Sequence, residues 1–319
     1  MKYRLVFLTD PLSQLHAYKD STVAMMLEAQ ARGWEIHSTT LQGLFLENSQ
    51  LFLTTQKIHL EDKAKDWFSL EEKETHPASF FHVIFMRKDP PFDTPYLHAT
   101  YLLDHAVAAG TWVMNHPKAL REYNEKMHTT WFPQCCVSSL VSQEASHLRK
   151  FIREEKDVIL KPLDAMGGEL IFRVKETEPN LSVILETITQ RGTEYVMAQQ
   201  YIPDIAKGDK RILMVNGEPI PYALARLPAP GETRGNLAAG GKPQAQPLSE
   251  RDLWICKELG PSLREKGLFF VGLDVIGDYL TEINITSPTC IRELHKETGL
   301  NAASILLDAM ALQLNHQRL

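Results

Sequence analysis

Residues 270–284 have the sequence FVGLDVIGDYLTEIN, in which two apolar runs flank a Gly-Asp turn signal. This pattern predicts a β-hairpin. Side chains at positions i and i+2 of a strand point to the same face, so Glu282 and Asn284 present two oxygens in one direction. Hard oxygen ligands suit Mg²⁺, which proteins hold with few groups of their own. The segment therefore predicts a magnesium site, and a half-buried hairpin with solvated polar residues fits it equally well.

The length of the turn decides whether Asp274 joins that face. A two-residue turn at residues 277–278 sets Asp274 opposite Thr281, on the wrong face. A three-residue loop that includes Tyr279 sets it opposite Glu282 instead. We expect the three-residue loop, because it brings the two carboxylates together.

Composition limits the class of protein. The chain has 319 residues, 44% hydrophobic content and a formal net charge of -6 at pH 7. This length suggests two or three compact units, and the dispersed lysines and arginines offer no basic stripe for nucleic acid. No apolar run approaches the ~20 residues that span a bilayer, so no membrane partner is expected. The four cysteines show neither a disulfide framework nor metal-ligand spacing, and we expect a cytoplasmic protein.

The first third alternates strand and helix signals. Strands at residues 3–8 and 34–38 flank a helix at residues 21–32, which Gly33 closes. This is a β-α-β unit of a parallel sheet, but its first turn lacks a G-x-G-x-x-G dinucleotide motif. Residues 40–79 are polar and weakly periodic, and the sequence assigns them no role beyond packing against the sheet or another subunit.

A cationic loop follows the next apolar run. Residues 80–86 predict a strand that ends in Arg87-Lys88-Asp89-Pro90-Pro91-Phe92-Asp93. Ligands of open α/β sheets bind at the carboxyl ends of the strands, and prolines restrict the shape of a loop. Arg87 can grip a substrate carboxylate bidentately. The alternative is an ordinary solvated loop. A helix at 96–109 and a strand at 111–115 then complete the first domain.

A glycine-rich connection marks the second unit. The strand at residues 158–162 ends in Lys161-Pro162, and the loop after it contains Gly167 and Gly168. Glycines let successive backbone N–H groups turn toward phosphate oxygens, while the lysine supplies positive charge. The pattern is not a P-loop, and most Gly-Gly pairs are simple hairpin turns. The preceding lysine favours the phosphate interpretation.

Three later segments fit the same nucleotide site. The strand and hinge at residues 195–203 can offer backbone groups to an adenine edge, although such a segment alone is more often just a strand end. Asp209 and Arg211 share one face of a strand, and Arg226 follows on another, so they can either stabilise a transferring phosphoryl group or form a surface salt-bridge ladder. Residues 228–241 are rich in glycine and are typical of a mobile lid.

Taken together, these motifs resemble those of bacterial glutathione synthetases, a family of the ATP-grasp superfamily. The resemblance runs nearly end to end, and its motifs are Met86 to Asp93, Asn124-Glu125-Lys126, Ile159 to Asp164 with Gly167-Gly168, Gly208 to Arg211, Gly231 to Gly241, and Thr281 to Thr289. It implies an α/β (α+β) architecture in which an ATP-grasp fold follows a Rossmann-like parallel-sheet domain. The implied parts are a substrate domain at 1–122, a central subdomain at 123–200 and a C-terminal subdomain at 201–319 with a mobile loop at about 227–243.

The resemblance also assigns roles by position. The residues implied to bind ATP are Lys126, Lys161, Gly167, Gly168, Gln199, Tyr201, Ile202 and Asp209. Those implied to bind Mg²⁺ are Asp274, Glu282 and Asn284. Those implied to stabilise developing negative charge are Arg211, Arg226 and Arg234. Those implied to contact the substrates are Arg87, Lys88, Asp89, Asn236, Ser287, Thr289 and Arg292.

The activity implied by the resemblance is the ligation of γ-glutamylcysteine to glycine. It uses ATP with Mg²⁺, or Mn²⁺ where that is tolerated, and passes through an acyl phosphate. Members of the family suggest a homotetramer. One alternative is another ATP-grasp ligase, such as a D-alanine ligase, which would have a different loop in place of residues 87–93. The other is a nucleotide-binding protein without turnover, for which the arginines and the metal residues would have no use.

Overall fold

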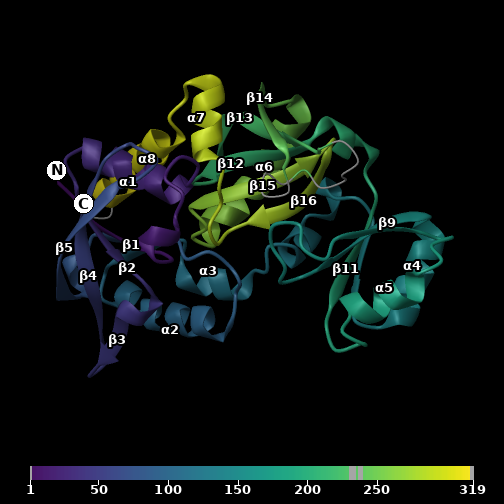
Figure 1. Cartoon of the computed structure of the whole chain (residues 1–319), viewed down its shortest axis with the longest axis horizontal. Helices are drawn as coiled ribbons and strands as arrows, with labels where there is room; N and C mark the ends of the chain where they lie inside the picture. Colours follow the sequence, from purple (N-terminus) through teal and green to yellow (C-terminus); the bar gives the residue numbers. More distant parts are fainter. Residues whose placement is uncertain (1, 230–234, 236–239, 317–319) are drawn as a thin grey trace.

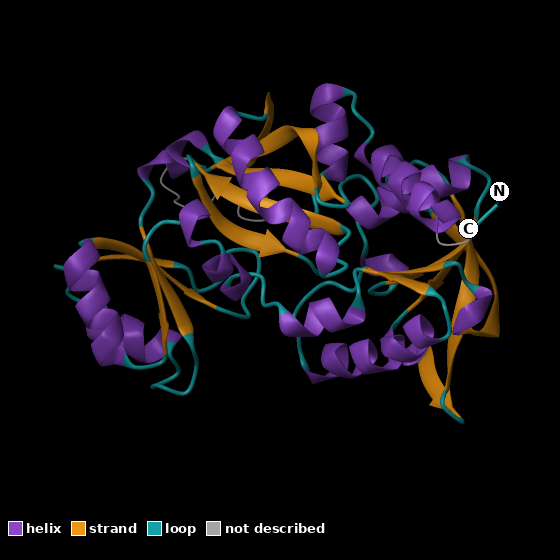
Figure 2. Ribbon diagram, turned by 180° about the vertical axis from the view of Figure 1, so that it is seen from behind, coloured by secondary structure: helices purple, strands orange, loops and turns teal. Residues whose placement is uncertain are grey.

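Three β-sheets succeed one another along the chain. The computed structural model describes residues 2–229, 235 and 240–316. Among these residues it contains a seven-stranded, a four-stranded and a five-stranded sheet. The five-stranded sheet lies between the other two, and helices cover all three (Figures 1 and 2). The expected α/β (α+β) class is confirmed, because the first sheet combines parallel and antiparallel strands and the other two sheets are antiparallel.

The first sheet is parallel at its centre, as the sequence predicts. Its order is β3-β4-β2-β1-β6-β7, and β5 pairs with β4. The parallel strands are β1 (Arg4–Leu8), β2 (Glu35–Thr39), β6 (Val83–Met86) and β7 (Trp112–Met114). The helices of this part are α1 (Ser21–Ala31), α2 (Thr94–Ala108) and α3 (Pro117–Glu122). Asp20 begins α1, where its carboxylate accepts the N–H groups of Thr22 and Val23 at 2.7 and 3.0 Å.

Residues 40–79 extend this sheet by antiparallel strands. They form β3 (Leu44–Glu47), β4 (Gln50–Leu60) and β5 (Phe68–Pro77). The register of β4 against β5 shifts between Gln56 and Ile58, which interrupts the period-two alternation of a regular strand. Most of β5 is exposed at the sheet edge. A bulged strand beside a polar edge strand explains why the sequence pattern here was weak.

The central unit is a four-stranded antiparallel sheet in the order β10-β9-β11-β8. Its strands are β8 (Ser139–Ser142), β9 (Asp157–Pro162), β10 (Phe172–Lys175) and β11 (Val196–Gln200). Two helices, α4 (Ala145–Glu155) and α5 (Leu181–Ile188), bury a separate small core against it. This unit lies at the end of the molecule opposite the two termini (Figure 1).

The third sheet has the order β14-β13-β12-β15-β16 and is antiparallel throughout. Its strands are β12 (Asp209–Val215), β13 (Glu218–Leu227), β14 (Lys242–Pro247), β15 (Phe270–Ile276) and β16 (Tyr279–Asn284). Its helices are α6 (Glu250–Glu265), α7 (Ile291–Thr298) and α8 (Ala302–His316). Helix α8 returns to pack against α1, where Arg32 and Asp308 form an ion pair of 2.7 Å.

The hairpin of β15 and β16 brings Asp274 opposite Glu282 by an unexpected route. Ile276 pairs with Tyr279, so the turn has two residues, and the expected three-residue loop is wrong. The register then shifts between Asp274 and Val275, which leaves Thr281 as an extra residue on β16. This β-bulge restores the pairing that the two-residue turn alone would have lost. Turn length and bulge position compensate each other, and the two carboxylates share a face.

A buried ion pair ties α6 to the sheet. Lys210 on β12 bonds the carboxylate of Asp252, whose side chain is 0% exposed. The same carboxylate accepts the N–H of Ser249 at 3.0 Å, and the Ser249 hydroxyl accepts the N–H of Asp252 at 3.1 Å. This reciprocal capping box begins the helix. One carboxylate therefore neutralises a buried lysine and completes a helix cap.

We predict that Asp252→Ala destabilises the protein by about 3 to 5 kcal/mol, because it leaves the Lys210 ammonium without its partner. Urea denaturation checks this as a lower midpoint at unchanged slope. Glu250→Ala serves as the control, since Glu250 is an exposed carboxylate in the same helical turn. The control should stay within about 0.5 kcal/mol of the parent chain. Equal midpoints for both variants would contradict the assignment.

Candidate active site

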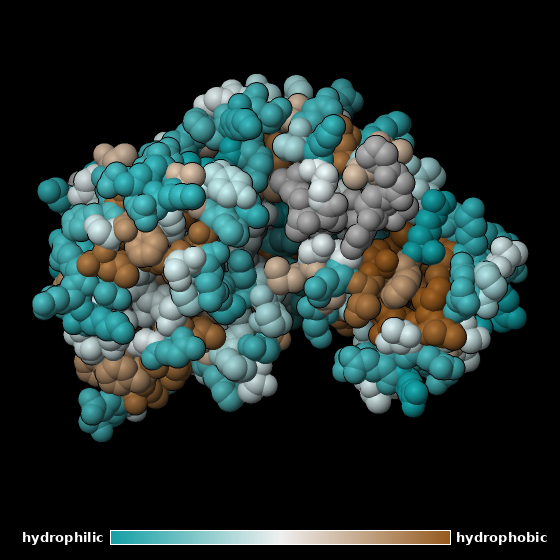
Figure 3. Space-filling model, viewed as in Figure 1, coloured by the Kyte–Doolittle hydropathy of each residue, from teal (hydrophilic) through white to brown (hydrophobic). Residues whose placement is uncertain are grey.

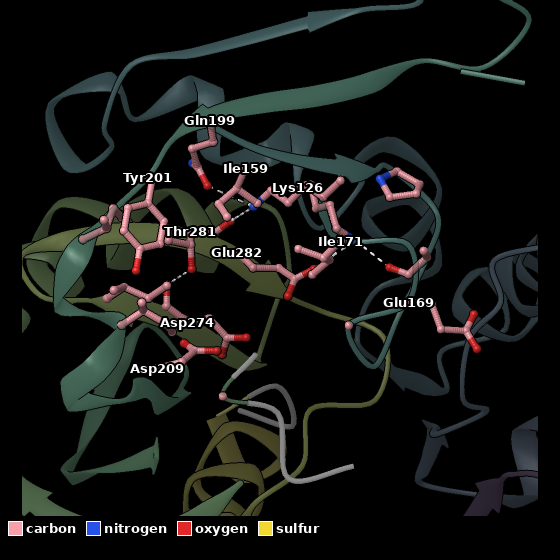
Figure 4. A pocket seen from close by; sticks show the side chains of 18 of the residues that line it. Lys126, Ile159, Glu169, Ile171, Gln199, Tyr201, Asp209, Asp274, Thr281 and Glu282 are labelled. Atoms are coloured by element: carbon pink, nitrogen blue, oxygen red, sulfur yellow. Dashed lines mark hydrogen bonds and ion pairs between the residues drawn. The ribbon is translucent and has the colours of Figure 1, made fainter. Parts of the chain in front are cut away.

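A pocket lies where the central sheet faces the third sheet. It is lined from one side by β9, β11 and the loop after β9, and from the other by β12, β15 and β16. Figure 4 shows Lys126, Gln199, Asp274 and Glu282 among the side chains around it. Hydrophobic side chains also gather on the visible face of the central unit (Figure 3). A site between two units, apolar with a few polar groups, is typical of a cofactor or substrate pocket.

Lys161 is a buried residue in the lining of the pocket. Its ammonium donates to Gln199 Oε1 at 3.1 Å and to the carbonyl of Thr281 at 2.9 Å. The lysine thus links the two sheets that form the pocket walls. Burial lowers the pKa of Lys161 to about 8, although the negative charge of Glu282 acts in the opposite direction. The sequence-based expectation that Lys161 belongs to the site agrees with this position.

Lys126 enters the same pocket from the segment after α3. Its ammonium lies 3.2 Å from Glu282 Oε1 and 2.6 Å from the carbonyl of Ala165. The second contact holds the loop that carries Gly167 and Gly168. Both glycines have positive φ angles, 65° and 86°, in the region where a side chain is strained. Only the family resemblance indicated Lys126, because a lone lysine after a helix carries no local signal.

The hinge after β11 differs in part from expectation. The N–H groups of Gln200 and Tyr201 are used, since they donate to the carbonyls of Ser138 and Asp157 at 3.0 Å each. They are therefore not free for a base. The amide nitrogen of the buried Gln199 has no partner among the described residues, and Tyr201 and Ile202 line the pocket. One donor on this wall that lacks a partner in the described part of the chain is therefore a side chain, the Gln199 amide.

Four buried charges form a ladder across three neighbouring strands. Asp209 pairs in register with Arg226, and Arg211 pairs with Asp274. Arg211 binds Asp274 through two nitrogens, at 2.5 and 3.1 Å, and Arg226 bonds both Asp209 and Asp274, the latter at 2.9 Å. Of the two open interpretations, a salt-bridge ladder is what the side chains form, but it is buried rather than on the surface.

The pKa values of the two carboxylates in this ladder are shifted in opposite directions. Burial alone would raise the pKa of Asp274, but Arg211 and Arg226 outweigh it and hold that pKa well below its usual range. Burial raises the pKa of Asp209 to about 6, although Arg226 opposes this. Asp209 Oδ1 has no hydrogen-bond partner among the described residues. The ladder thus keeps Asp274 ionised, whereas the cost of burying the charge of Asp209 is only partly offset by its neighbours.

The proposed metal residues lie on one edge of this ladder. Glu282 stands opposite Asp274, and Asn284 follows two positions later on β16. Asn284 donates its amide to the carbonyl of Gly272 at 3.1 Å, which directs the amide nitrogen away from a cation. No group of three or more His, Cys, Asp or Glu residues suited to a metal occurs within residues 2–229, 235 and 240–316. Glu282 and Asn284 nevertheless fit Mg²⁺, which takes one or two carboxylates with the remaining positions left to water and phosphate.

The cationic loop after β6 is tied to the protein more tightly than expected. Arg87 is buried, and its guanidinium donates to the Thr22 hydroxyl at 3.0 Å and to the Pro288 carbonyl at 2.9 Å. Two of its nitrogens are thus occupied within the chain. Lys88 pairs with Asp10 at 2.9 Å. Arg87 therefore joins the first sheet to the segment after β16.

The remaining substrate candidates divide between two places. Burial raises the pKa of Asp89, although a hydrogen bond to Ser287 opposes this, and the two residues come from loops that meet. Thr289 lies beside Cys290, with 3.8 Å between its hydroxyl and the sulfur. Arg292 pairs instead with Asp62 at 2.9 Å and lines a different cavity, between α1 and α7. Arg234 and Asn236 lie outside the described residues.

Two residues that sequence reasoning did not single out belong to these surroundings. Asp10 follows β1 at the carboxyl edge of the sheet, and it binds both Lys88 and the N–H of Asp89, the latter at 3.1 Å. Its position after a parallel strand was a usable signal. Glu125 accepts three hydrogen bonds from Ile285 and Thr286. Glu125 has no local sequence signal of its own, and only its position next to Lys126 draws attention to it.

Comparison with known proteins agrees with this architecture. Residues 3–121 match the family described as prokaryotic glutathione synthetase, N-terminal domain, and residues 125–299 match its ATP-grasp domain. A glutathione synthetase of Pseudomonas aeruginosa is 53% identical over 98% of this chain and 99% of its own length. One of Escherichia coli K12 is 49% identical over the same shares.

Solved structures share the fold at much lower identity. A D-cycloserine synthetase, DcsG, superposes with a TM-score of 0.68 at 15% identity, over 98% of this chain and 99% of the other. The ATP-grasp ligase PsnB, complexed with its minimal precursor, Mg and ADP, gives 0.62 at 16% identity, over 98% of both chains. A D-alanyl-alanine synthetase of Vibrio cholerae gives 0.58 at 11%, over 98% of both chains. The chain therefore belongs to the prokaryotic glutathione synthetase family and is an ATP-dependent ligase of the ATP-grasp fold.

Proposed function

We propose that this chain makes glutathione by joining γ-glutamylcysteine to glycine, with ATP converted to ADP and phosphate. The observation that carries the proposal is the convergence of two lysines and a carboxylate in one pocket. Lys126, Lys161 and Glu282 line the same pocket, and an ion pair of 3.2 Å joins Lys126 to Glu282. Two ammonium groups beside an acidic edge suit a polyphosphate with its divalent ion.

The nucleotide would occupy the pocket between the two sheets. Lys126 and Lys161 would hold its phosphates, and the loop with Gly167 and Gly168 would cover them. Gln199, Tyr201 and Ile202 would frame the adenine, for which the unpaired amide nitrogen of Gln199 is a ready donor. Asp209, whose buried Oδ1 has no partner among the described residues, would face the same nucleotide. Binding would thus satisfy groups that burial leaves unpaired.

A divalent ion, Mg²⁺ or Mn²⁺, would be held by Glu282 and Asn284, and when bound it neutralises charge on the phosphates. Asp274 has both of its oxygens engaged by arginines. We therefore place Asp274 at the edge of the metal site, where its negative charge adds to the electrostatic attraction for the divalent cation. Arg211 and Arg226 would stabilise negative charge that develops during phosphoryl transfer, and at the same time they keep Asp274 ionised.

The chemistry follows in two steps. The cysteinyl carboxylate of the dipeptide attacks the γ-phosphorus of ATP, which forms an acyl phosphate and releases ADP. The amine of glycine then adds to the acyl carbon, loses its proton, and expels phosphate from the tetrahedral intermediate. No nucleophile from the protein is required. Exclusion of water from the acyl phosphate is the expected role of the segment with Arg234 and Asn236, which lies outside the described residues.

The dipeptide and glycine would approach from the first sheet. Lys88 and Asp89 lie at the carboxyl end of β6, and Ser287 and Thr289 lie in the segment that meets them. Arg87 would act mainly by holding these two loops together, because two of its three nitrogens already bond Thr22 and Pro288. A direct role for Arg292 would require it to leave its pairing with Asp62.

We also propose a cytoplasmic enzyme that assembles as a homotetramer. All four cysteines are free, in agreement with a reducing compartment. No helix in the described part of the chain is long and apolar enough to cross a membrane. Exposed aromatic residues such as Phe45 and Tyr101 could be covered by another copy. Sedimentation of the purified chain would decide the number of subunits.

We predict that ADP release from Mg-ATP requires both γ-glutamylcysteine and glycine. The loop at residues 87–93 matches the glutathione synthetase motif rather than that of the rival ligase, so D-alanine alone should give no turnover. A coupled assay of ADP, with chromatography of the peptide product, measures this. ADP release with D-alanine alone would show that the chain has the activity of a D-alanine ligase instead. Nucleotide binding without turnover on either substrate would make it a binding protein.

We predict that Glu282→Ala lowers kcat/KM roughly 100-fold or more, because a metal ligand supplies several kcal/mol of charge stabilisation. Steady-state kinetics at several Mg²⁺ concentrations measures the change. It should also show that the variant needs a higher Mg²⁺ concentration for half-maximal activity. The matched control is Asp278→Ala, which removes an exposed carboxylate from the turn of the same hairpin. The role of Glu282 would be ruled out by equal activity in the two variants.

We predict that ATP binding weakens as pH rises through about 8, because burial lowers the pKa of Lys161 to about 8 and only its protonated form attracts phosphate. Below that pH Lys161 stays protonated, so its contribution to the ATP affinity should not change with pH. Equilibrium binding of ATP from pH 7 to 9.5 tests it. In Lys161→Met the affinity should be lower and this dependence absent. A wild-type profile that is flat to pH 9.5 would refute the assignment.

A further inference from the structure

Glu125 joins the linker that carries Lys126 to the end of β16 and the residues that follow it. One oxygen of its carboxylate, Oε1, accepts the N–H of Ile285 at 2.7 Å. The same oxygen accepts the N–H of Thr286 at 3.0 Å and its hydroxyl at 2.9 Å. In addition, the main-chain carbonyl of Glu125 accepts the N–H of Ile283 at 2.9 Å. Four donors from residues 283–286 therefore converge on this single residue.

From this geometry we infer that Glu125 is a positioning residue for the ligation reaction. It would hold the segment 285–289, which leaves the metal strand β16, in register with the linker that carries Lys126. This inference rests on the proposed function and goes beyond it, because Glu125 acts through its neighbours. The side chain needs no contact with ATP or with either substrate.

The position of Glu125 explains why such a clamp matters. Next to it in sequence, Lys126 lies 3.2 Å from Glu282, so the linker and β16 carry groups that must meet at the phosphates. Beyond Thr286, the Pro288 carbonyl accepts a bond from Arg87 at 2.9 Å. The segment 285–289 is thereby held from one side by the linker and from the other by the first sheet. Loss of the linker side would release the loop that faces the substrates.

A carboxylate suits this position better than a neutral group. Three donors directed at one oxygen are accepted most strongly by an ionised acceptor, since charge-assisted hydrogen bonds are roughly twice as strong as neutral ones. An amide oxygen at the same place can accept the same bonds with less charge. A side chain without an acceptor leaves three donors of the segment unpaired, at a cost for each buried donor.

The test compares Glu125→Ala, Glu125→Gln and the control Glu122→Gln. The control changes an exposed carboxylate on the same stretch, whose nearest ion-pair partner is Lys118 at 3.7 Å. We expect Glu125→Ala to lower kcat for glutathione formation roughly 10- to 100-fold, the usual effect of lost supporting contacts around a metal site. The Kd for ATP should stay within about threefold of the parent value, because Lys126 keeps its bond to Ala165.

Rescue separates positioning from a general loss of structure. Glu125→Gln keeps one acceptor oxygen and should recover most of kcat, while Glu122→Gln should match the parent chain. A kcat for Glu125→Ala equal to the parent value would overturn the inference. So would a Glu125→Gln variant as slow as Glu125→Ala. Inactivity of the parent chain itself would reject the proposed function rather than the role of Glu125.

A second route avoids dependence on the folding of Glu125→Ala. Thr286→Val removes one of the three donors while keeping the side-chain shape, and it should lower kcat less than Glu125→Ala. Because Glu125→Gln retains the acceptor oxygen, Thr286→Val should lower kcat by a similar factor in the parent chain and in the Glu125→Gln background. A Thr286→Val variant with the kcat of the parent chain would also overturn the inference.

Discussion

The buried ladder of four charges on β12, β13 and β15 is the constraint around which the site is organised. Arginine and aspartate side chains cannot be buried at acceptable cost unless each is paired and hydrogen-bonded. Register alone brings Asp209 opposite Arg226 and Arg211 opposite Asp274. A slip of one residue in either strand pair would leave unpaired charges in the core. The ladder thus stabilises one register of these three strands, and the bulge of the β15–β16 hairpin then sets Glu282 opposite Asp274.

The pocket depends on contacts that cross between sheets rather than on any single motif. Lys161 reaches from β9 to the carbonyl of Thr281, and Lys126 reaches from the linker to Glu282. Thr281 is the bulge residue of β16, so the irregular pairing of the hairpin also presents the carbonyl that Lys161 bonds. The same bulge that aligns the carboxylates therefore helps to join the central unit to the third sheet.

Much of the site could be predicted because its residues sit at positions with simple geometric meaning. A lysine at the end of a strand, paired glycines in the next loop, and carboxylate and amide oxygens two positions apart all follow from strand periodicity. Lys126 and Glu125 could not be found this way, because each depends on contacts with residues about 40 or 160 positions away along the chain. Arg87 was found, but its burial between two loops was not foreseeable from its own segment.

The sequence by itself determined the parallel β-α-β start, the apolar strands, the polar face of β16 and membership in its family, since these rest on local periodicity and on motifs. Tertiary structure alone decided the two-residue turn with its bulge, the strands within residues 40–79 and the pairing of Arg292 with Asp62. The physical reason is the same in each case. Bulges, edge strands and ion pairs depend on the free energy of contacts with distant segments, and a local sequence pattern carries no information about which distant partner is present.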